Sequence, residues 1–591
     1  MTFKHPAAFV LVVAAVALAV GFSRTPLWDE DEPRFAAIAR AMVESGDWVV
    51  PIYNDTLAVD KPVLMHWCMA AAMSVFGPNE FAARLPSAVA VLLTALALLR
   101  AGRRWFDVET GVVAALAYVG CLLVGIEAHA ATPDAILAAL TVWATVLAAD
   151  PFLPDRRTAA LPTPDGPLPL PLLTVPRSAA IGGLAGLAVI CKGPIGFIGP
   201  AAVILPWVAW LALDRRRAAG GRLLPSLLPA ALAACRAIRP LTILAATLAV
   251  AGPWYVAVSL RTDGAWTSGF FFVHNVGRFL SPMEKHGGSV FFHPLTMLVG
   301  FYPWSCFLPL AIVVAGWRLW RRTVPPASVA TLGLLLTWLA VWVGGFSVAA
   351  TKLPNYILPA YPAAALLVAA LGVEAARLAA AARWPHGWWL ASGLGWLAFG
   401  GAATAATVIV AARYGATGAE PAALVGLVPV GGAIAAGWLA RRRPQGALAA
   451  LVLTGLIYTA LAVGPAGSRV AGSNTLPALV RDMQARHEGA ARLGTYLLAS
   501  PNVVFYSNGH VRQFVMEHDA AAAEFLRTGR DAILLVPEDR YDEIAATLPA
   551  GWGVVGRTRP MFRRHDVLAI GALPDAPATS PRTAAAPEVT R

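Results

Sequence analysis

The sequence predicts a polytopic α-helical membrane protein. Of its 591 residues, 58% are hydrophobic and only 14% are charged, and the mean hydropathy is +0.62. A soluble domain carries about 25% charged residues. Apolar runs of about 17–25 residues, the length that an α-helix needs to cross the hydrocarbon core, recur along most of the chain.

About thirteen such runs are candidate spans by this length criterion. They lie near residues 6–22, 83–101, 109–127, 132–149, 179–195, 196–213, 240–259, 294–314, 327–347, 354–372, 387–412, 422–440 and 446–464. The first run could instead be a cleaved signal peptide, although no clear small-residue cleavage site follows it.

The net charge of +12 does not indicate a nucleic-acid partner, because the arginines fall in short clusters between apolar runs. Loops rich in Lys and Arg are typical of the cytoplasmic side. If the N-terminus is cytoplasmic, every cluster lies inside, and residues 23–82, 260–293 and the C-terminal region lie outside. The clusters are Arg100/Arg103/Arg104, Arg156/Arg157, Arg215–Arg217, Arg318/Arg321/Arg322 and Arg441–Arg443.

Three segments are therefore expected. Residues 1–464 form the membrane region, in which residues 23–82 hold two shorter helical patterns on the outer side. Residues 465–572 alternate strand-like and helical runs, which predicts a small α/β domain. Residues 573–591 are rich in Pro, Ala and Thr and are expected to be disordered. The expected strands are LGTYLL, NVVFY, DAILLVP, GWGVVG and DVLAIG, with helices near 475–486, 519–527 and 539–547.

The acidic stretch Asp29–Glu32 opens a predicted amphipathic helix in the outer region. Pro33 suits its first turn, Asp31 or Glu32 its N-cap and Gly46 its end. One face is apolar, so we expect the helix to lie in the membrane interface; its residues are Phe35, Ile38, Ala39, Met42 and Val43. On local pattern alone, Asp31 could be a helix cap and Arg34 a surface charge. A DxD nucleotide-sugar motif is disfavoured, because no βα scaffold surrounds it.

Other polar residues are predicted on the same outer side. Each has a bland explanation as a helix-terminal or solvated loop residue, but their convergence on one face favours a shared site. They are Asp60 and Lys61 at a helix start, Asp134 in the first turn of a span, His274 and Arg278 in one outer loop, and Lys352 and Tyr356 in another.

Seven motifs carry a family resemblance over about residues 25–370. They are LWDEDEPRFAAIARAMVESGDWVVP, DKPVLMHW, FGPNEFAARLPSAVA, TPDAILAAL, CKGPIGFIGP, HNVGRF and TKLPNYILPAYP. In this order they resemble the polyprenyl-phosphate-sugar-dependent glycosyltransferases of the GT-C fold. The bacterial aminoarabinose transferases of lipid A modification look nearest, and protein O-mannosyltransferases look more distant. His274, Asp60 and Phe35 depart from residues common in these relatives.

The resemblance implies a mechanism and roles for individual residues. Asp31, in the acidic pair with Glu32, would be the base that takes the proton of an acceptor hydroxyl, and Arg34 would orient it or touch the phosphate. Asp134 resembles the second acidic position of the fold. Lys61 and Arg278 match the contacts to the lipid phosphate, and Lys352 and Tyr356 are further candidates. No cofactor is required by this mechanism, but a divalent metal between Asp60 and His274 is possible.

The same resemblance implies an undecaprenyl-phosphate-linked sugar as donor and a bacterial inner-membrane enzyme with a periplasmic site. It also implies inversion of the anomeric configuration. The acceptor is open between lipid A, a glycan, a protein and a second lipid. Two other classes of protein are the alternatives to an enzyme, a secondary transporter and a non-catalytic lipid-binding protein. A secondary transporter would place its polar residues midway through spans, whereas here they gather at outer helix ends. A non-catalytic lipid-binding protein would not need the pairing of Asp31 with Lys61.

Overall fold

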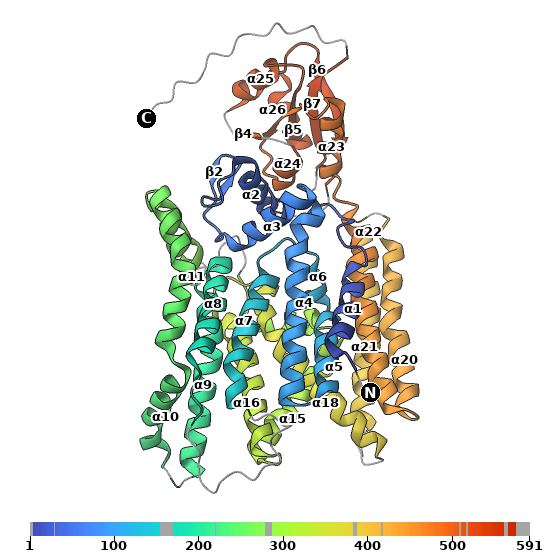
Figure 1. The fold of residues 1–591 in the computed structure, drawn as a ribbon. Coiled ribbons are helices and arrows are strands. Elements are labelled where there is room, and N and C mark those ends of the chain that lie inside the picture. The colour runs from blue at the N-terminus through green and yellow to red at the C-terminus, as the bar shows by residue number, and fades with distance from the viewer. Residues whose placement is uncertain are drawn as a thin grey trace.

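The computed structural model describes residues 4–28, 30–153, 170–218, 220, 222–277, 287–381, 387–414, 416, 418–507, 510–515, 518–560 and 565–574. Figure 1 shows a bundle of long helices with a small α/β unit at one end. Between the two lie α2 (Asp31–Ser45) and α3 (Leu64–Phe76). These two helices form a platform over the ends of the long helices.

Ten helical segments of the described chain are long and apolar enough to cross a membrane. Helices α5 (Val108–Val119) and α6 (Leu122–Ala128), which bend by 67° at their break, add an eleventh if the pair is counted as one span. The protein is therefore a multi-span membrane protein. The ten contain α4 (Glu80–Trp105), α7 (Asp134–Ala149), α8 (Val175–Lys192), α9 (Ile195–Ala218), α11 (Pro240–Arg261), α16 (Pro326–Leu339) with α17 (Gly345–Val348), η5 (Pro354–Ala360) with α18 (Tyr361–Ala380), α19 (Gly387–Arg413), η6 (Glu420–Gly426) with α20 (Leu427–Ala440), and α21 (Pro444–Leu461) with α22 (Gly467–Ala471).

The expected count of about thirteen spans is not confirmed. The run at 6–22 forms α1 (Pro6–Ala19), whose 14 residues are about 21 Å long, shorter than the ~30 Å hydrocarbon core. The run at 294–314 is divided into α14 (Phe292–Gly300) and α15 (Leu308–Arg321) by the 3-10 turn η3 (Trp304–Cys306). Conversely, α10 (Leu223–Ile238) is a short apolar helix in a segment where no span was expected.

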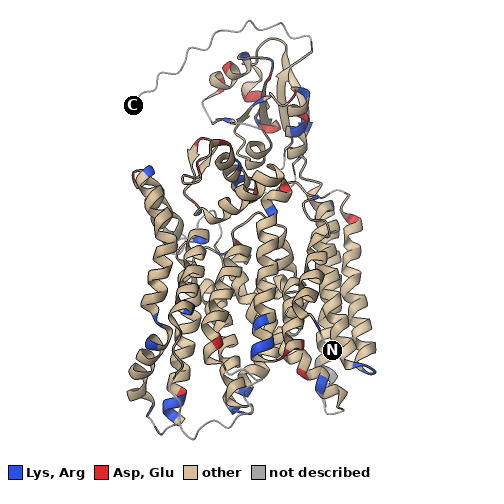
Figure 2. Cartoon of the chain, in the orientation of Figure 1, with Lys and Arg blue, Asp and Glu red and all other residues tan. Residues whose placement is uncertain are grey.

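The described charges are distributed unevenly along the helical bundle. Figure 2 shows its Lys and Arg residues gathered mainly at the end opposite the α/β unit. One of them, Arg100, pairs with the fully buried Asp150 at 2.6 Å, and Trp105 Nε1 donates to the same carboxylate at 3.0 Å. This asymmetry agrees with the clusters in the sequence.

The C-terminal unit is a five-stranded mixed sheet in the order β4-β3-β5-β7-β6. The strands are β3 (Arg492–Tyr496), β4 (Arg512–Phe514), β5 (Ala532–Pro537), β6 (Trp552–Thr558) and β7 (Val567–Ala572). Strands β4, β3 and β5 are parallel, and β7 is antiparallel to both neighbours. Helices α23 (Leu476–Arg486), α25 (Asp519–Arg527) and α26 (Tyr541–Ala545) accompany the sheet. Residues 575–591 of the predicted tail lie outside the described chain.

One predicted strand was wrong. The sequence NVVFY is helix α24 (Pro501–Tyr506), and the strand beside β3 is instead the short β4. Residues 502–506 are all buried, so they show no alternation that would separate a strand from a helix. Pro501 occupies the first turn of α24, where its fixed φ favours a helix.

Helix α2 confirms the predicted end but not the predicted surroundings. It ends at Gly46, whose φ of 70° favours glycine, and its N-cap is Glu30 rather than Asp31 or Glu32. Its apolar face is buried against α3 and α24, so the helix does not lie with that face in the membrane interface. Only Val43 of the expected apolar face is exposed.

Candidate active site

A large cavity lies where the platform meets the membrane helices. Its volume is about 1670 Å³, larger than the ~300–1,000 Å³ of an ordinary small-molecule pocket. One part of its wall is charged and includes Asp31 and Arg34 of α2 and Asp60 and Lys61 from the segment before α3. The other part is mainly apolar and comes from membrane helices, with Leu298, Val299, Trp396, Phe399, Val425 and Val463 among its residues.

Asp31 is the first residue of α2, and its side chain is exposed to this cavity. Desolvation by the surrounding walls raises its pKa, Lys61 opposes that rise, and Asp60 and Asp134 add to it. The carboxylate therefore keeps more proton affinity than a solvated aspartate. A group placed in this way can accept a proton from a hydroxyl bound in the cavity.

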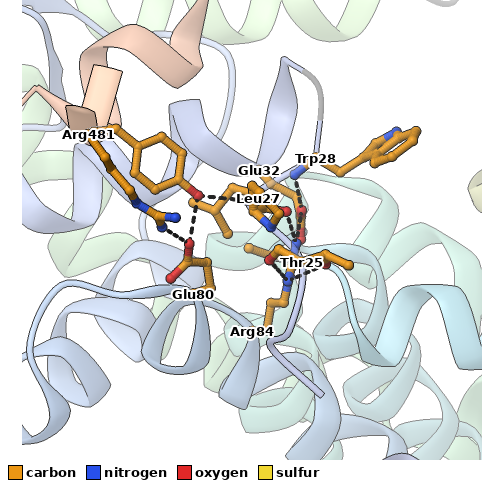
Figure 3. A network of polar contacts seen from close by, with 10 residues as sticks. Thr25, Leu27, Trp28, Glu32, Glu80, Arg84 and Arg481 are labelled. Carbon is orange, nitrogen blue, oxygen red and sulfur yellow. Dashed lines mark hydrogen bonds and ion pairs between the residues drawn. The ribbon is translucent and has the colours of Figure 1, made fainter. Parts of the chain in front are cut away.

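Glu32, the next residue, has different surroundings (Figure 3). It forms an ion pair with the equally buried Arg84, in which Nη2 and Nε lie 2.7 and 3.0 Å from the two carboxylate oxygens. The backbone N–H groups of Trp28 and Ala131 donate to those oxygens at 2.5 and 2.6 Å. Four donors thus engage the carboxylate, and we interpret its role as holding α2 against α4 and the loop before α7.

Asp60, Lys61 and Arg34 belong to the same charged part of the wall as Asp31. Arg34 Nη2 lies 3.4 Å from Asp60 Oδ1, and its guanidinium lies 5.0 Å from the centre of the Tyr53 ring. Tyr53 belongs to a hairpin of β1 (Ile52–Tyr53) and β2 (Thr56–Leu57). Burial raises the pKa of Asp60, but Lys61, Arg34 and His66 outweigh that effect and hold the pKa below its ordinary value. Both cations therefore face an ionised carboxylate.

Asp134 begins α7, as predicted, and lies in a buried cluster that includes two residues the sequence analysis missed. Lys192 Nζ donates to Asp134 Oδ1, and Asn355 Nδ2 donates to Oδ2 at 3.0 Å. The same ammonium lies 4.9 Å from the centre of the Tyr356 ring. The signal for Lys192 was a lysine at the end of an apolar span, in the motif CKGPIGFIGP. Asn355 shows no signal apart from its place next to Tyr356.

Lys352 is not among the residues that line the cavity. Its ammonium is buried and donates to the carbonyl oxygens of Ser347 and Ala349 at 2.9 and 2.7 Å, beyond the last turn of α17. A cation at a helix C-terminus is stabilised by the helix dipole. Tyr356 is likewise absent from the cavity wall and instead contacts Lys192 and Phe346. The structure therefore does not bring these two predicted residues to the cavity.

Two predicted residues lie in the outer loop that follows α12 (Ala265–Ser268). His274, in the π-helical turn η2 (Gly269–Gly277), lines the cavity together with Asp60. Arg278 lies outside the described residues. Within the described ranges, no three His, Cys, Asp or Glu side chains form a group that could hold a metal ion. Among the described residues, Asp60 is paired with Arg34.

The fold is shared with solved structures. Over 95% of this chain and 97% of the other, it matches the crystal structure of ArnT from Cupriavidus metallidurans bound to undecaprenyl phosphate, with a TM-score of 0.72 and 22% sequence identity. The chain has the GT-C fold. The fold predicted from the sequence motifs is thereby confirmed.

Sequence comparisons agree with the GT-C fold. Residues 60–160 match the family model described as dolichyl-phosphate-mannose-protein mannosyltransferase. The chain is 28% identical over 393 residues to the undecaprenyl phosphate-alpha-4-amino-4-deoxy-L-arabinose arabinosyl transferase of Erwinia tasmaniensis, covering 66% of this chain and 62% of that protein. It is 31% identical over 357 residues to the protein of the same name from Aeromonas salmonicida, covering 59% and 56%. The match thus spans about three fifths of the length of these relatives.

Proposed function

We propose that this GT-C protein is a membrane glycosyltransferase. It moves a sugar from an undecaprenyl-phosphate-type lipid to a hydroxyl of an envelope acceptor such as lipid A, with inversion at the anomeric carbon. The observation that carries the proposal is a cavity in which two carboxylates, Asp31 and Asp60, and two cations, Arg34 and Lys61, line one part of the wall, and apolar side chains of membrane helices line the other. The names of the similar proteins support the same chemistry.

The proposed lipid donor matches both the charged and the apolar part of the cavity wall. A polyprenyl chain would lie along the apolar residues of α14, α19 and α21, because burial of apolar surface contributes about 25 cal/mol per Å². Its phosphate would then reach Lys61 and Arg34. Lys acts on phosphate as a compact charge, and Arg can hold two of its oxygens. Arg278 stays a predicted phosphate contact.

Asp31 acts as the base in this mechanism. The acceptor oxygen attacks the anomeric carbon, its proton passes to the Asp31 carboxylate, and the bond from that carbon to the phosphate oxygen breaks. The leaving lipid phosphate gains negative charge as this bond breaks, so the cations of the charged wall stabilise the transition state more than the ground state. Protein cations supply the neutralisation, and no step is assigned to a metal.

The remaining predicted residues hold this arrangement. Glu32 fixes the start of α2 through Arg84, and Asp134 fixes the ends of α7, α8 and η5 through Lys192 and Asn355. Tyr356 covers Lys192, and Lys352 holds the turn after α17. None of these four donates or accepts a proton in the proposed reaction.

We further propose that the cavity opens on the periplasmic side of a bacterial inner membrane. The basic end of the bundle is then cytoplasmic, as is the N-terminus, and the α/β unit within residues 465–572 is periplasmic. Residues 1–464 form the catalytic membrane region in this division.

The test uses the purified full-length chain in lipid nanodiscs with a labelled polyprenyl-phosphate-sugar and an envelope extract. We expect label to move to an extractable acceptor and free polyprenyl phosphate to form, and mass spectrometry identifies the acceptor. Transport of label into sealed vesicles without any glycosyl product would instead indicate a transporter. Direct use of a nucleotide sugar, with no lipid-linked donor present, would contradict the proposal.

A further inference from the structure

A chain of contacts runs from the C-terminal unit to the segment that precedes α2, the helix that begins at Asp31 (Figure 3). Tyr506, the last residue of α24, is buried against the platform. Its hydroxyl accepts a hydrogen bond from the Leu27 N–H at 2.8 Å and donates one to Glu80 Oε1 at 2.9 Å. Arg481 of α23 pairs with Glu80, and its guanidinium lies 4.4 Å from the centre of the Tyr506 ring.

The segment held in this way is short and is bound at every residue. Arg84 donates to the carbonyl oxygens of Thr25 and Pro26 at 2.8 and 2.9 Å. The Leu27 N–H donates to Tyr506, and the Trp28 N–H donates to Glu32 at 2.5 Å. Residues 25–28, which we name the strap, therefore have their position fixed by α4 on one side and the C-terminal unit on the other.

The backbone N–H of Leu27 relies on the Tyr506 hydroxyl as its hydrogen-bond acceptor. Leu27 is fully buried, so its N–H has no access to solvent and needs a protein acceptor. The described acceptor is a side chain 479 positions away in the sequence. A second contact supports the same coupling, because Arg40 of α2 donates to the carbonyl oxygens of Phe505 and Val504 at 2.6 and 3.2 Å.

We infer that Tyr506 is a positioning residue for Asp31: through Leu27 and the strap, the C-terminal unit sets the place of the base in the cavity. The inference rests on the proposed function, since it assumes that Asp31 takes the proton. A base must lie within hydrogen-bond reach of the hydroxyl that it deprotonates, and a shift of about 1 Å can lower the rate about 100-fold. The unit thus acts on the chemical step and not on lipid binding alone.

The variant Tyr506→Phe tests this, because it removes one oxygen and keeps the ring beneath Arg481. We expect kcat to fall roughly 10- to 100-fold. The KM for the lipid donor should change by less than about twofold, since the proposed phosphate contacts Lys61 and Arg34 are not part of residues 25–28. The matched control is Tyr496→Phe, in the same unit. The Tyr496 hydroxyl contacts Asp519 at 2.5 Å and Glu543 at 3.3 Å and does not touch the strap. This control should keep its kcat.

A second measurement does not depend on turnover. Hydrogen exchange followed by mass spectrometry should show faster exchange of a peptide covering residues 25–35 in Tyr506→Phe and not in Tyr496→Phe. If exchange rises as expected while wild-type protein makes no product, Tyr506 does hold the strap and it is the proposed function that fails. If exchange is unchanged in Tyr506→Phe, the inference itself is overturned.

Conservative and non-conservative changes of Glu80 separate a positioning role of this network from a general loss of stability. Glu80→Gln keeps a carbonyl acceptor for the Tyr506 hydroxyl and should keep most of kcat, whereas Glu80→Ala should lower it as Tyr506→Phe does. Combining Tyr506→Phe with Glu80→Ala should cost little more than either change alone, because both break one connected network. Equal loss of kcat in the Tyr496→Phe control, or independent additive losses in the double variant, would overturn the inference.

Discussion

Asp31 and Glu32 are neighbouring carboxylates with opposite surroundings. Four donors engage the buried Glu32, including Nε and Nη2 of the buried Arg84. Asp31 faces the cavity, and among the described residues no side chain donates a hydrogen bond to it. The first turn of one helix thus supplies a fixed anchor and, one residue earlier, a carboxylate able to take a proton. In the proposed mechanism, the acidic motif is therefore catalytic at Asp31 and structural at Glu32.

The strongest test of this division is Asp31→Asn. The amide cannot accept the proton, so turnover should fall by about 10²–10⁴-fold while the protein stays folded in the membrane. Glu44→Gln, on the exposed last turn of the same helix, is the matched control and should keep activity. Product formation by purified protein is the measurement, and near wild-type turnover of Asp31→Asn would make this residue merely structural.

The corresponding carboxylate-to-amide change at the next residue, Glu32→Gln, should lower stability instead. Glu32→Gln leaves the Arg84 guanidinium buried without its counter-charge, and breaking a buried ion pair in this way typically costs about 3–5 kcal/mol. Thermal or denaturant unfolding in detergent should show the loss, together with poor accumulation in the membrane. A Glu32→Gln protein with full stability and no turnover would reverse the roles assigned to these two carboxylates.

Two lysines extend the comparison to cations. Lys61→Ala should weaken use of the lipid-linked sugar and binding of the released lipid phosphate, each by roughly tenfold, because a charge-assisted contact of about 1.5 kcal/mol or more is lost. Lys352→Ala should lower the melting temperature and leave lipid-phosphate binding intact, because its ammonium bonds to two backbone carbonyls. Binding measured with labelled polyprenyl phosphate distinguishes the two, and equal binding losses would place Lys352 in the site.

The smallest effect concerns pH. Because desolvation raises the pKa of Asp31 above its ordinary value of 3.8, kcat/KM should rise with pH along a limb that lies above that value. Between the two pKa values the folded chain holds a proton that the unfolded chain releases, so stability falls as pH rises through this window. At neutral pH the ionised Asp31 opposes folding, and Asp31→Asn should raise the melting temperature slightly. A lower melting temperature would contradict the sign.

The sequence predicted much of the fold and the part of the site that depends on local pattern. Long apolar runs located the membrane helices, and proline, acidic and glycine signals located α2 and the start of α7. Residues whose role comes from tertiary convergence were missed. Lys192 and Asn355 meet Asp134 from 58 and 221 positions away, and no local pattern encodes that meeting. Lys352 shows the opposite case. Its predicted place on the outer side made it a candidate contact to phosphate, but no local pattern revealed that its ammonium donates to backbone carbonyls.

Helix α24 shows the same limit. Its five buried side chains 502–506 read as a strand because burial on all sides erases periodicity. The surroundings of this segment come from distant parts of the chain. Helix α24 packs against α2, and the carbonyl oxygens of Val504 and Phe505 accept hydrogen bonds from Arg40. The sequence separates these partners by more than 460 positions.

That separation also has a consequence for the order in which the molecule is completed during synthesis. The strap leaves the ribosome among the first thirty residues, but its partner Tyr506 follows 479 positions later. At about 5–20 residues per second, the strap waits roughly half a minute or longer for its hydroxyl. By the inference above, a nascent or prematurely terminated chain carries Asp31 without the Tyr506 contact, so the proposed base is not positioned until the C-terminal unit has been made and has docked on the strap.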